Sequence, residues 1–121
     1  MLRERGFACA DWDPFFAPGA GSPPQGPHDF VVATEVLEHL RRPGETLLAL
    51  DALLKPGGVL AVLTGVLEDD AAFPKWWYHQ DPTHIAFWRP ETLAWAAKSR
   101  GWSLERPSKD AALFFKRAIP A

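Results

Sequence analysis

Residues 29–40 read DFVVATEVLEHL, an apolar run followed at once by two carboxylates and a histidine. The apolar residues 30–33 are continuous, which is typical of a parallel strand that is buried on both faces. The segment after them predicts a short helix over residues 36–41, with Thr34 as its N-cap. So abrupt a change marks either the polar face of a helix or the rim of a site.

The sequence on both sides of this stretch predicts alternating strands and helices, which indicates an α/β sheet. Pro43 is expected to open a helix in which Leu47, Leu50 and Leu54 form a core stripe. The expected elements are a helix end at 1–5, strand 7–12, loop 17–27, strand 29–34, helices 36–41 and 43–54, strand 59–64, an irregular aromatic segment 68–90, helix 90–100 with Gly101 as its cap, and antiparallel strands 102–105 and 111–116.

Three segments are expected to meet at one edge of this sheet. In open α/β sheets the ligand crevice lies at the carboxyl ends of the parallel strands. This rule brings together Asp13, residues 34–39 and the loop after Thr64.

Composition narrows the class of protein. A length of 121 residues suits one domain, and the net charge is −2. No basic run is longer than Arg41–Arg42, so nucleic acid is not the expected partner and a neutral small molecule fits better. No apolar run approaches the ~20 residues that span a membrane. The single cysteine, Cys9, cannot form an internal disulfide, and we expect a cytoplasmic location.

Four segments together resemble the class I S-adenosylmethionine-dependent methyltransferases. They are DFVVATEVLEHL (29–40), LLKPGGVLAVLT (53–64), WWYHQDPTHIAFWRPETL (76–93) and RGW (100–102). The resemblance implies that residues 1–121 form a single domain, the C-terminal two-thirds of this fold. It implies a partial Rossmann-like sheet, mostly parallel, with an antiparallel C-terminal strand pair and helices on both faces. It also implies S-adenosylmethionine as the cofactor.

One part of the family pattern is missing from residues 1–121, namely the glycine-rich loop that binds the cofactor. Gly19 and Gly21 lie instead after the strand that matches the family's second strand. We therefore expect a fragment, a misplaced start or a degenerate copy, and weak or no cofactor binding by the isolated chain. The family's first strand would separate strands 7–12 and 29–34, and exposed strand edges recruit other chains. This predicts a homo-oligomer formed through an unpaired strand edge.

Asp13, Thr34, Glu35 and Val36 are the expected cofactor-binding residues. By resemblance, an acid at the position of Asp13 accepts hydrogen bonds from the ribose hydroxyls, which suits a carboxylate. A turn-forming aspartate before a proline is the alternative. By resemblance the other three lie near the methionine part of the cofactor, although they also suit an ordinary helix start.

Glu35, Glu38 and His39 stand at i, i+3 and i+4, which places them on one face of a helix. Spacing alone favours a solvated face. The pattern E-x-x-E-H is, however, similar to the metal-binding motif of ubiquinone-pathway O-methyltransferases and of small-RNA 2′-O-methyltransferases. This resemblance implies a divalent metal, Mn²⁺ or Mg²⁺, held by Glu35, Glu38, His39 and His84.

Without a metal, a histidine would act as a general base, because imidazole titrates near neutral pH. The candidates are His39, His79 and His84. Residues 73–88 are expected to wall the substrate pocket, with aromatic packing over the sheet as the alternative. The expected substrate residues are Trp76, Trp77, Tyr78, Asp81, Phe87 and Trp88.

These patterns predict an S-adenosylmethionine-dependent methyltransferase that acts on a small molecule, with a hydroxyl as the methyl acceptor. One alternative is a degenerate, non-catalytic domain that serves as an interaction partner. The other is a metal-assisted RNA 2′-O-methyltransferase, against which the acidic charge balance weighs.

Overall fold

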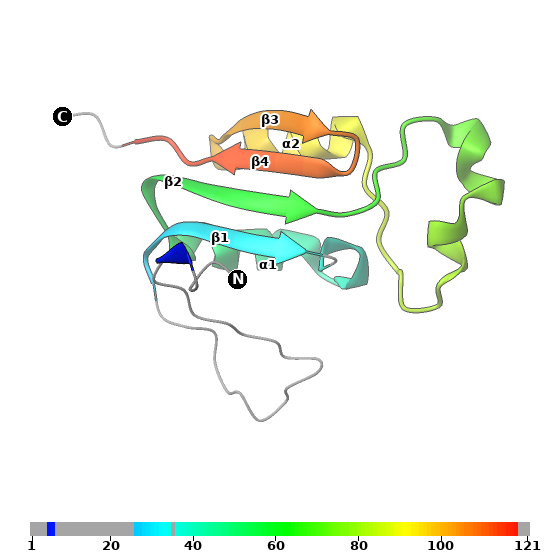
Figure 1. Ribbon diagram of the computed structural model, residues 1–121, viewed down its shortest axis with the longest axis horizontal. Coiled ribbons are helices and arrows are strands. Elements are labelled where there is room, and N and C mark those ends of the chain that lie inside the picture. The colour runs from blue at the N-terminus through cyan, green and yellow to red at the C-terminus, as the bar shows by residue number, and fades with distance from the viewer. Residues whose placement is uncertain (1–4, 7–25, 35, 119–121) are drawn as a thin grey trace, which may run out of the picture.

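The computed structural model describes residues 5–6, 26–34 and 36–118 (Figure 1). The elements in chain order are β1 (His28–Thr34), the 3₁₀ turn η3 (Leu37–His39), α1 (Pro43–Leu53), β2 (Leu54–Leu63), η4 (Asp70–Lys75), η5 (Trp77–Gln80), α2 (Pro90–Arg100), β3 (Ser103–Ser108) and β4 (Ala111–Phe115). The predicted strand at 7–12 and the predicted helix end at 1–5 fall largely outside the described residues.

The strands form one sheet with the order β1-β2-β4-β3. β1 runs parallel to β2, with Val31 opposite Leu60. β4 runs antiparallel to both β2 and β3. The predicted α/β class with an antiparallel C-terminal strand pair is confirmed, and the described sheet has one parallel and two antiparallel pairings.

α1 and α2 both lie behind the sheet in the view of Figure 1. The expected helices on both faces are therefore not seen in the part of the chain that the structure describes. Val32 is 51% exposed. The expectation that β1 is buried on both faces is therefore wrong, since the two long helices cover the same face of the sheet.

The hydrophobic core fills the space between these helices and the sheet. Alternate side chains of β2 point into this core, since Leu60 and Val62 are buried while Leu63 is exposed. This period of two is what a strand gives when one face is covered. Buried residues from the other elements complete the core: Ala33, Leu47, Leu93, Ala96, Ala97, Ala112 and Phe114.

Proline and glycine set the ends of the helices. α2 begins at Pro90 and ends at Arg100, and Gly101 caps it: its φ of 70° is left-handed and its N–H donates to the carbonyls of Ala97 and Lys98. This helix and its cap are confirmed. The predicted helix over 36–41 is only the single turn η3, because Leu40 is already extended and a residue before proline, here Arg42, avoids the α conformation.

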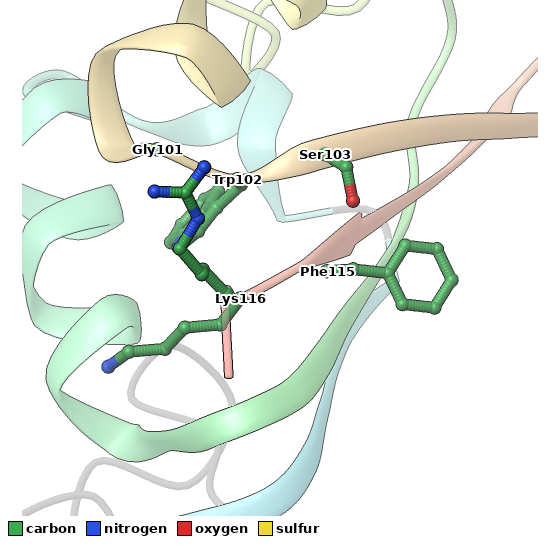
Figure 2. Close-up of a pocket in the computed structure, with 6 residues that line it drawn as sticks. Gly101, Trp102, Ser103, Phe115 and Lys116 are labelled. Carbon is green, nitrogen blue, oxygen red and sulfur yellow. The ribbon is translucent and has the colours of Figure 1, made fainter. Parts of the chain in front are cut away.

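The end of the sheet opposite the carboxyl ends of β1 and β2 is held together by Asp51. Its carboxylate lies 3.1 Å from Nζ of Lys116 and accepts from Nε1 of Trp102 at 3.2 Å. Nζ of Lys116 also donates to the carbonyls of Asp51 and Leu54. A shallow hollow of about 290 Å³ lies beside this network (Figure 2), lined by Gly101, Trp102, Ser103, Phe115, Lys116 and Arg117. Its lysine is already engaged by Asp51 and by two backbone carbonyls.

Within the described residues, no helix is long and apolar enough to cross a membrane.

Replacing Leu60 with alanine tests this core. Leu60 is fully buried, so Leu60→Ala should lower the free energy of unfolding by about 2–5 kcal/mol. Leu63→Ala, in the same strand but exposed, should lower it much less. The measurement is urea unfolding followed by circular dichroism. Equal losses in the two variants would contradict the orientation of β2.

Candidate functional site

The carboxyl ends of β1 and β2 lie side by side, with Thr34 paired to Leu63. The chain leaves β1 into η3 and leaves β2 at Thr64. The backbone of this exit is fixed, because the N–H of Thr64 donates to the carbonyl of Asp110 and the N–H of Val66 donates to its carboxylate. Two segments distant in sequence thus meet at one edge of the sheet.

Glu38 is the centre of this edge. Its side chain is fully buried, and its Oε2 accepts a hydrogen bond of 2.7 Å from Oγ1 of Thr64, which is also buried. Its backbone carbonyl accepts from the N–H groups of Ile85 and Ala86 at 2.8 and 3.0 Å. Glu38 therefore does not lie on a solvated face, because the segment before α2 covers it.

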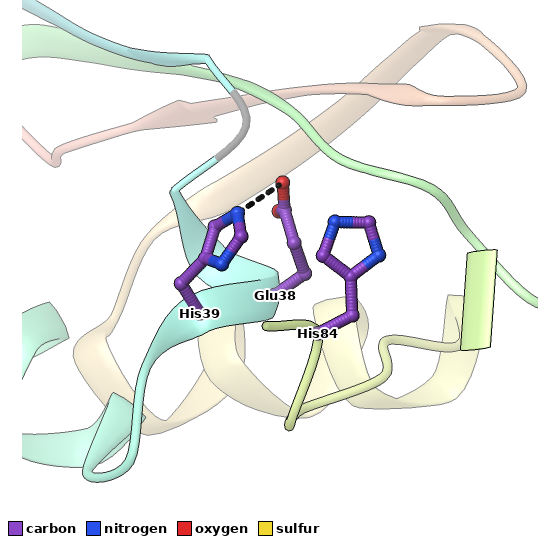
Figure 3. Close-up of side chains that lie close together, drawn as sticks. All are labelled: Glu38, His39 and His84. Atoms are coloured by element: carbon purple, nitrogen blue, oxygen red, sulfur yellow. Dashed lines mark ion pairs between the residues drawn. The ribbon is translucent and has the colours of Figure 1, made fainter. Parts of the chain in front are cut away.

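His39 and His84 flank Glu38, as Figure 3 shows. Nδ1 of His39 lies 2.8 Å from the carbonyl oxygen of Thr83, and Nδ1 of His84 lies 2.7 Å from that of Tyr78. A carbonyl can only accept, so each Nδ1 carries the proton. Each Nε2 is then the nitrogen left to bind a proton or a cation.

These Nε2 atoms face carboxylates. That of His39 lies 3.7 Å from Oε1 of Glu38, and that of His84 lies 3.6 Å from Oδ2 of Asp81. One ligand atom from each of Glu38, His39 and His84 falls within 4.8 Å of the others. The side chain of His39 is 28% exposed and that of His84 only 6%, so His39 is the histidine that solvent reaches.

Asp81 organises a tight turn next to the histidines. Its Oδ1 accepts from the N–H of Thr83 at 2.9 Å and from Oγ1 of Thr83 at 2.7 Å. These two hydrogen bonds, the side-chain bond first, lower the pKa of the Asp81 carboxyl below its ordinary value, with smaller contributions from His84 and His39. The carboxylate is therefore ionised at neutral pH.

The aromatic segment divides into packed and partly exposed residues. Tyr78 and Trp88 are buried, and Trp88 donates from Nε1 to the carbonyl of Leu37. The ring of Tyr78 lies so close to Gly65 that a Cβ there would come within 2.9 Å of it. Trp76 stacks on Tyr78 with ring centroids 5.0 Å apart, and Phe87 lies 5.9 Å from Trp76. Tyr78 and Trp88 thus pack inside the protein, as the alternative to a substrate wall predicts, while Trp76 and Phe87 stay partly accessible.

Of the other predicted site residues, Thr34 lies exposed at the end of β1 and Val36 packs against the core. Asp13 and Glu35 lie outside the described residues, as do the side chains of Trp77 and His79. Sequence reasoning missed Thr64 as the partner of Glu38 and Thr83 as the partner of His39. The only signal was a hydroxyl residue at the end of an apolar strand and another in a D-P-T-H turn.

Comparison with known proteins identifies the fold. Residues 1–106 match the profile of the family described as methyltransferase domain. The chain belongs to this methyltransferase family. The resemblance to class I S-adenosylmethionine-dependent methyltransferases is thereby confirmed.

This methyltransferase domain is similar in sequence to one kind of known protein and in structure to two solved proteins. A ubiquinone biosynthesis O-methyltransferase of Caulobacter vibrioides is 42% identical over 59 residues, which are 49% of this chain and 21% of that protein. An O-methyltransferase family protein from Burkholderia thailandensis superposes with a TM-score of 0.63 at 21% identity, over 93% of this chain and 36% of that one. The [4+2]-cyclase SpnF superposes with a TM-score of 0.52 at 24% identity, over 87% and 37%. At these identities the two structures show the fold alone.

Replacing Thr64 tests the burial of Glu38. Thr64→Val keeps the shape of the side chain but removes the donor to a buried carboxylate, so it should lower the free energy of unfolding by about 1–3 kcal/mol. Thr64→Ser keeps the hydroxyl and should recover most of the loss. Thr34→Val, at the exposed end of β1, is the control. Chemical denaturation of the three variants gives the comparison, and a fully stable Thr64→Val protein would refute this account of Glu38.

Proposed function

We propose that this methyltransferase domain transfers a methyl group from S-adenosylmethionine to a hydroxyl group of a small molecule. The observation that carries the proposal is the cluster of Glu38, His39 and His84 at the carboxyl ends of two parallel strands. The similarity to a curated O-methyltransferase supports oxygen as the acceptor. Because the aligned stretch covers only 21% of that relative, activity, cofactor and substrate are all part of the proposal.

The residues that reach the cofactor are expected at the end of β1. Thr34 is exposed there and Val36 follows it, which suits contacts with the methionine part. When bound, the cofactor would supply an electrophilic methyl group on sulfur for transfer to the acceptor oxygen. The protein must hold the acceptor oxygen in line and remove its proton.

His39 is the residue best placed to remove that proton. Its Nδ1–H is fixed on the carbonyl of Thr83, so the lone pair of neutral imidazole is on Nε2. Oε1 of Glu38, 3.7 Å from Nε2, stabilises the imidazolium that forms when the proton arrives.

A divalent cation is the second way in which the same cluster could activate a hydroxyl, and its donor set fits one. Metal-ligating histidines usually donate their second ring N–H to a carbonyl or carboxylate, as His39 and His84 both do. One carboxylate oxygen with two imidazole nitrogens suits Mn²⁺ better than Mg²⁺. When bound, such an ion would lower the pKa of a coordinated hydroxyl. Glu38, His39 and His84 would hold it, and Glu35, the fourth predicted ligand, lies outside the described residues.

The general-base proposal predicts a large effect at His39. His39→Gln should lower the rate of methyl transfer by about 10²–10⁴-fold, because proton removal by the imidazole is lost. His28→Gln, at the opposite end of β1, should leave the rate unchanged. Release of S-adenosylhomocysteine with a panel of small hydroxylated acceptors measures the rate. Absence of any transfer by the wild-type protein would favour the non-catalytic alternative, and equal rates in the two variants would exclude His39 as the base.

The metal proposal predicts a loss of affinity that does not depend on turnover. Titration with Mn²⁺ followed by electron paramagnetic resonance should show one site, which Glu38→Gln and His84→Gln each weaken by about tenfold or more. Glu45→Gln, an exposed carboxylate in α1, is the matched control. Affinities that are equal in all four proteins would rule out this cluster as the metal site.

The remaining sequence-based expectations stay proposals: a small-molecule partner, a homo-oligomer formed through a strand edge and a cytoplasmic location.

A further inference from the structure

A single four-residue turn contains one histidine of the cluster and contacts the other. The turn, residues 81–84, is closed by the hydrogen bond from the N–H of His84 to the carbonyl of Asp81 at 3.0 Å. Inside it, Oδ1 of Asp81 accepts from the N–H and the hydroxyl of Thr83. Three hydrogen bonds in four residues fix the direction of the Thr83 carbonyl and of the His84 side chain.

The turn positions the two histidines in different ways. The carbonyl of Thr83 accepts the Nδ1–H of His39, which belongs to a distant segment. The next residue, His84, enters the cluster itself, and its ring lies edge-on to that of His39 with centroids 4.9 Å apart. Loss of the turn would therefore release both imidazoles at once.

We infer that Asp81 is a positioning residue, which holds the Nε2 atoms of His39 and His84 in the cluster by closing the turn that carries the carbonyl partner of His39 and His84 itself.

The hydrogen bonds of Asp81, rather than its charge, do the positioning. Its side chain is 42% exposed, and its Oδ2 is 3.6 Å from Nε2 of His84, so solvent screens the attraction between them. The two bonds from Thr83 are shorter, at 2.9 and 2.7 Å, and both go to Oδ1. Asparagine also carries an oxygen at this position and forms the same kind of turn, so Asp81→Asn should keep it.

The tautomers of the histidines report this role directly. Two-bond ¹H–¹⁵N correlation spectra of the full chain, recorded in mildly alkaline buffer, distinguish Nδ1–H from Nε2–H. The wild-type protein should show the Nδ1–H form at both His39 and His84. Asp81→Ala should convert both to an exchanging mixture, whereas Asp81→Asn should keep the wild-type form. Spectra of His39→Gln and His84→Gln assign the signals.

Asp69 provides the matched control, because its Oδ1 also accepts a backbone N–H two residues on, at 3.0 Å from Ala71. Asp69→Ala should leave both tautomers unchanged. If Asp81→Ala does not fold, Thr83→Val takes its place, since it removes only the hydroxyl bond to Asp81, and partial mixing of the tautomers is expected. Unchanged tautomers in the variant that folds, or their loss in Asp81→Asn, would overturn the inference.

The predicted effect of Asp81 on the rate of methyl transfer rests on the proposed function, whereas its predicted effect on the histidine tautomers does not. Asp81→Ala should lower the rate of methyl transfer by about 100-fold, because misplacement of a catalytic group costs that much. If the wild-type protein is inactive and its tautomers still respond to Asp81→Ala, the proposed function fails while the positioning role stands. If the protein is active and Asp81→Ala changes neither rate nor tautomers, the positioning role fails alone.

Discussion

The hydrogen bond between Thr64 and the buried carboxylate of Glu38 is the constraint on which the site depends. A carboxyl group loses hydration on burial, and buried polar groups are normally hydrogen-bonded inside a protein. Here the Thr64 hydroxyl occupies Oε2, and the imidazole of His39 faces Oε1 at 3.7 Å. The fold therefore keeps a carboxyl group next to a histidine in a part of the molecule from which solvent is largely excluded.

The topology explains why these groups meet. β1 and β2 are parallel neighbours in register, so the residues that follow both strands emerge at the same edge. The aromatic segment then closes over this edge, because its backbone N–H groups at Ile85 and Ala86 are bonded to the carbonyl of Glu38. Fold alone does not assign a chemistry, since a cyclase shares this architecture as well as an O-methyltransferase family protein. The side chains at the edge carry the functional argument.

The sequence predicts well those helices and strands whose ends depend on residues close together in the chain. Pro90 and Gly101 mark α2 because one suits a first helical turn and the other a left-handed cap. The pairing of β3 with β4 followed from their short separation. The single turn η3 was predicted as a longer helix, because the apolar spacing of 36–40 gives no sign that Leu40 is extended. The exposed face of β1 was missed because an apolar run does not reveal which faces the rest of the molecule covers.

The site was predicted in part, and its decisive features depend on contacts between distant segments. Glu38 and His39 belong to the motif E-x-x-E-H and His84 to a later segment that the resemblance adds to it, and these three residues lie together. Spacing favoured a solvated Glu38, and only the partners Thr64, Ile85 and Ala86 make its burial possible. The side of each imidazole that carries its proton follows from the carbonyls of Thr83 and Tyr78, which no sequence pattern specifies.

Amide hydrogen exchange at Ile85 and Ala86, measured residue by residue by NMR, tests most directly whether this segment closes over Glu38. If both N–H groups donate to the Glu38 carbonyl, their exchange should be slowed to rates close to those of the core strands. Exchange at the rate of an open loop would mean that Glu38 is not enclosed, and the buried carboxylate at the centre of the site would not exist.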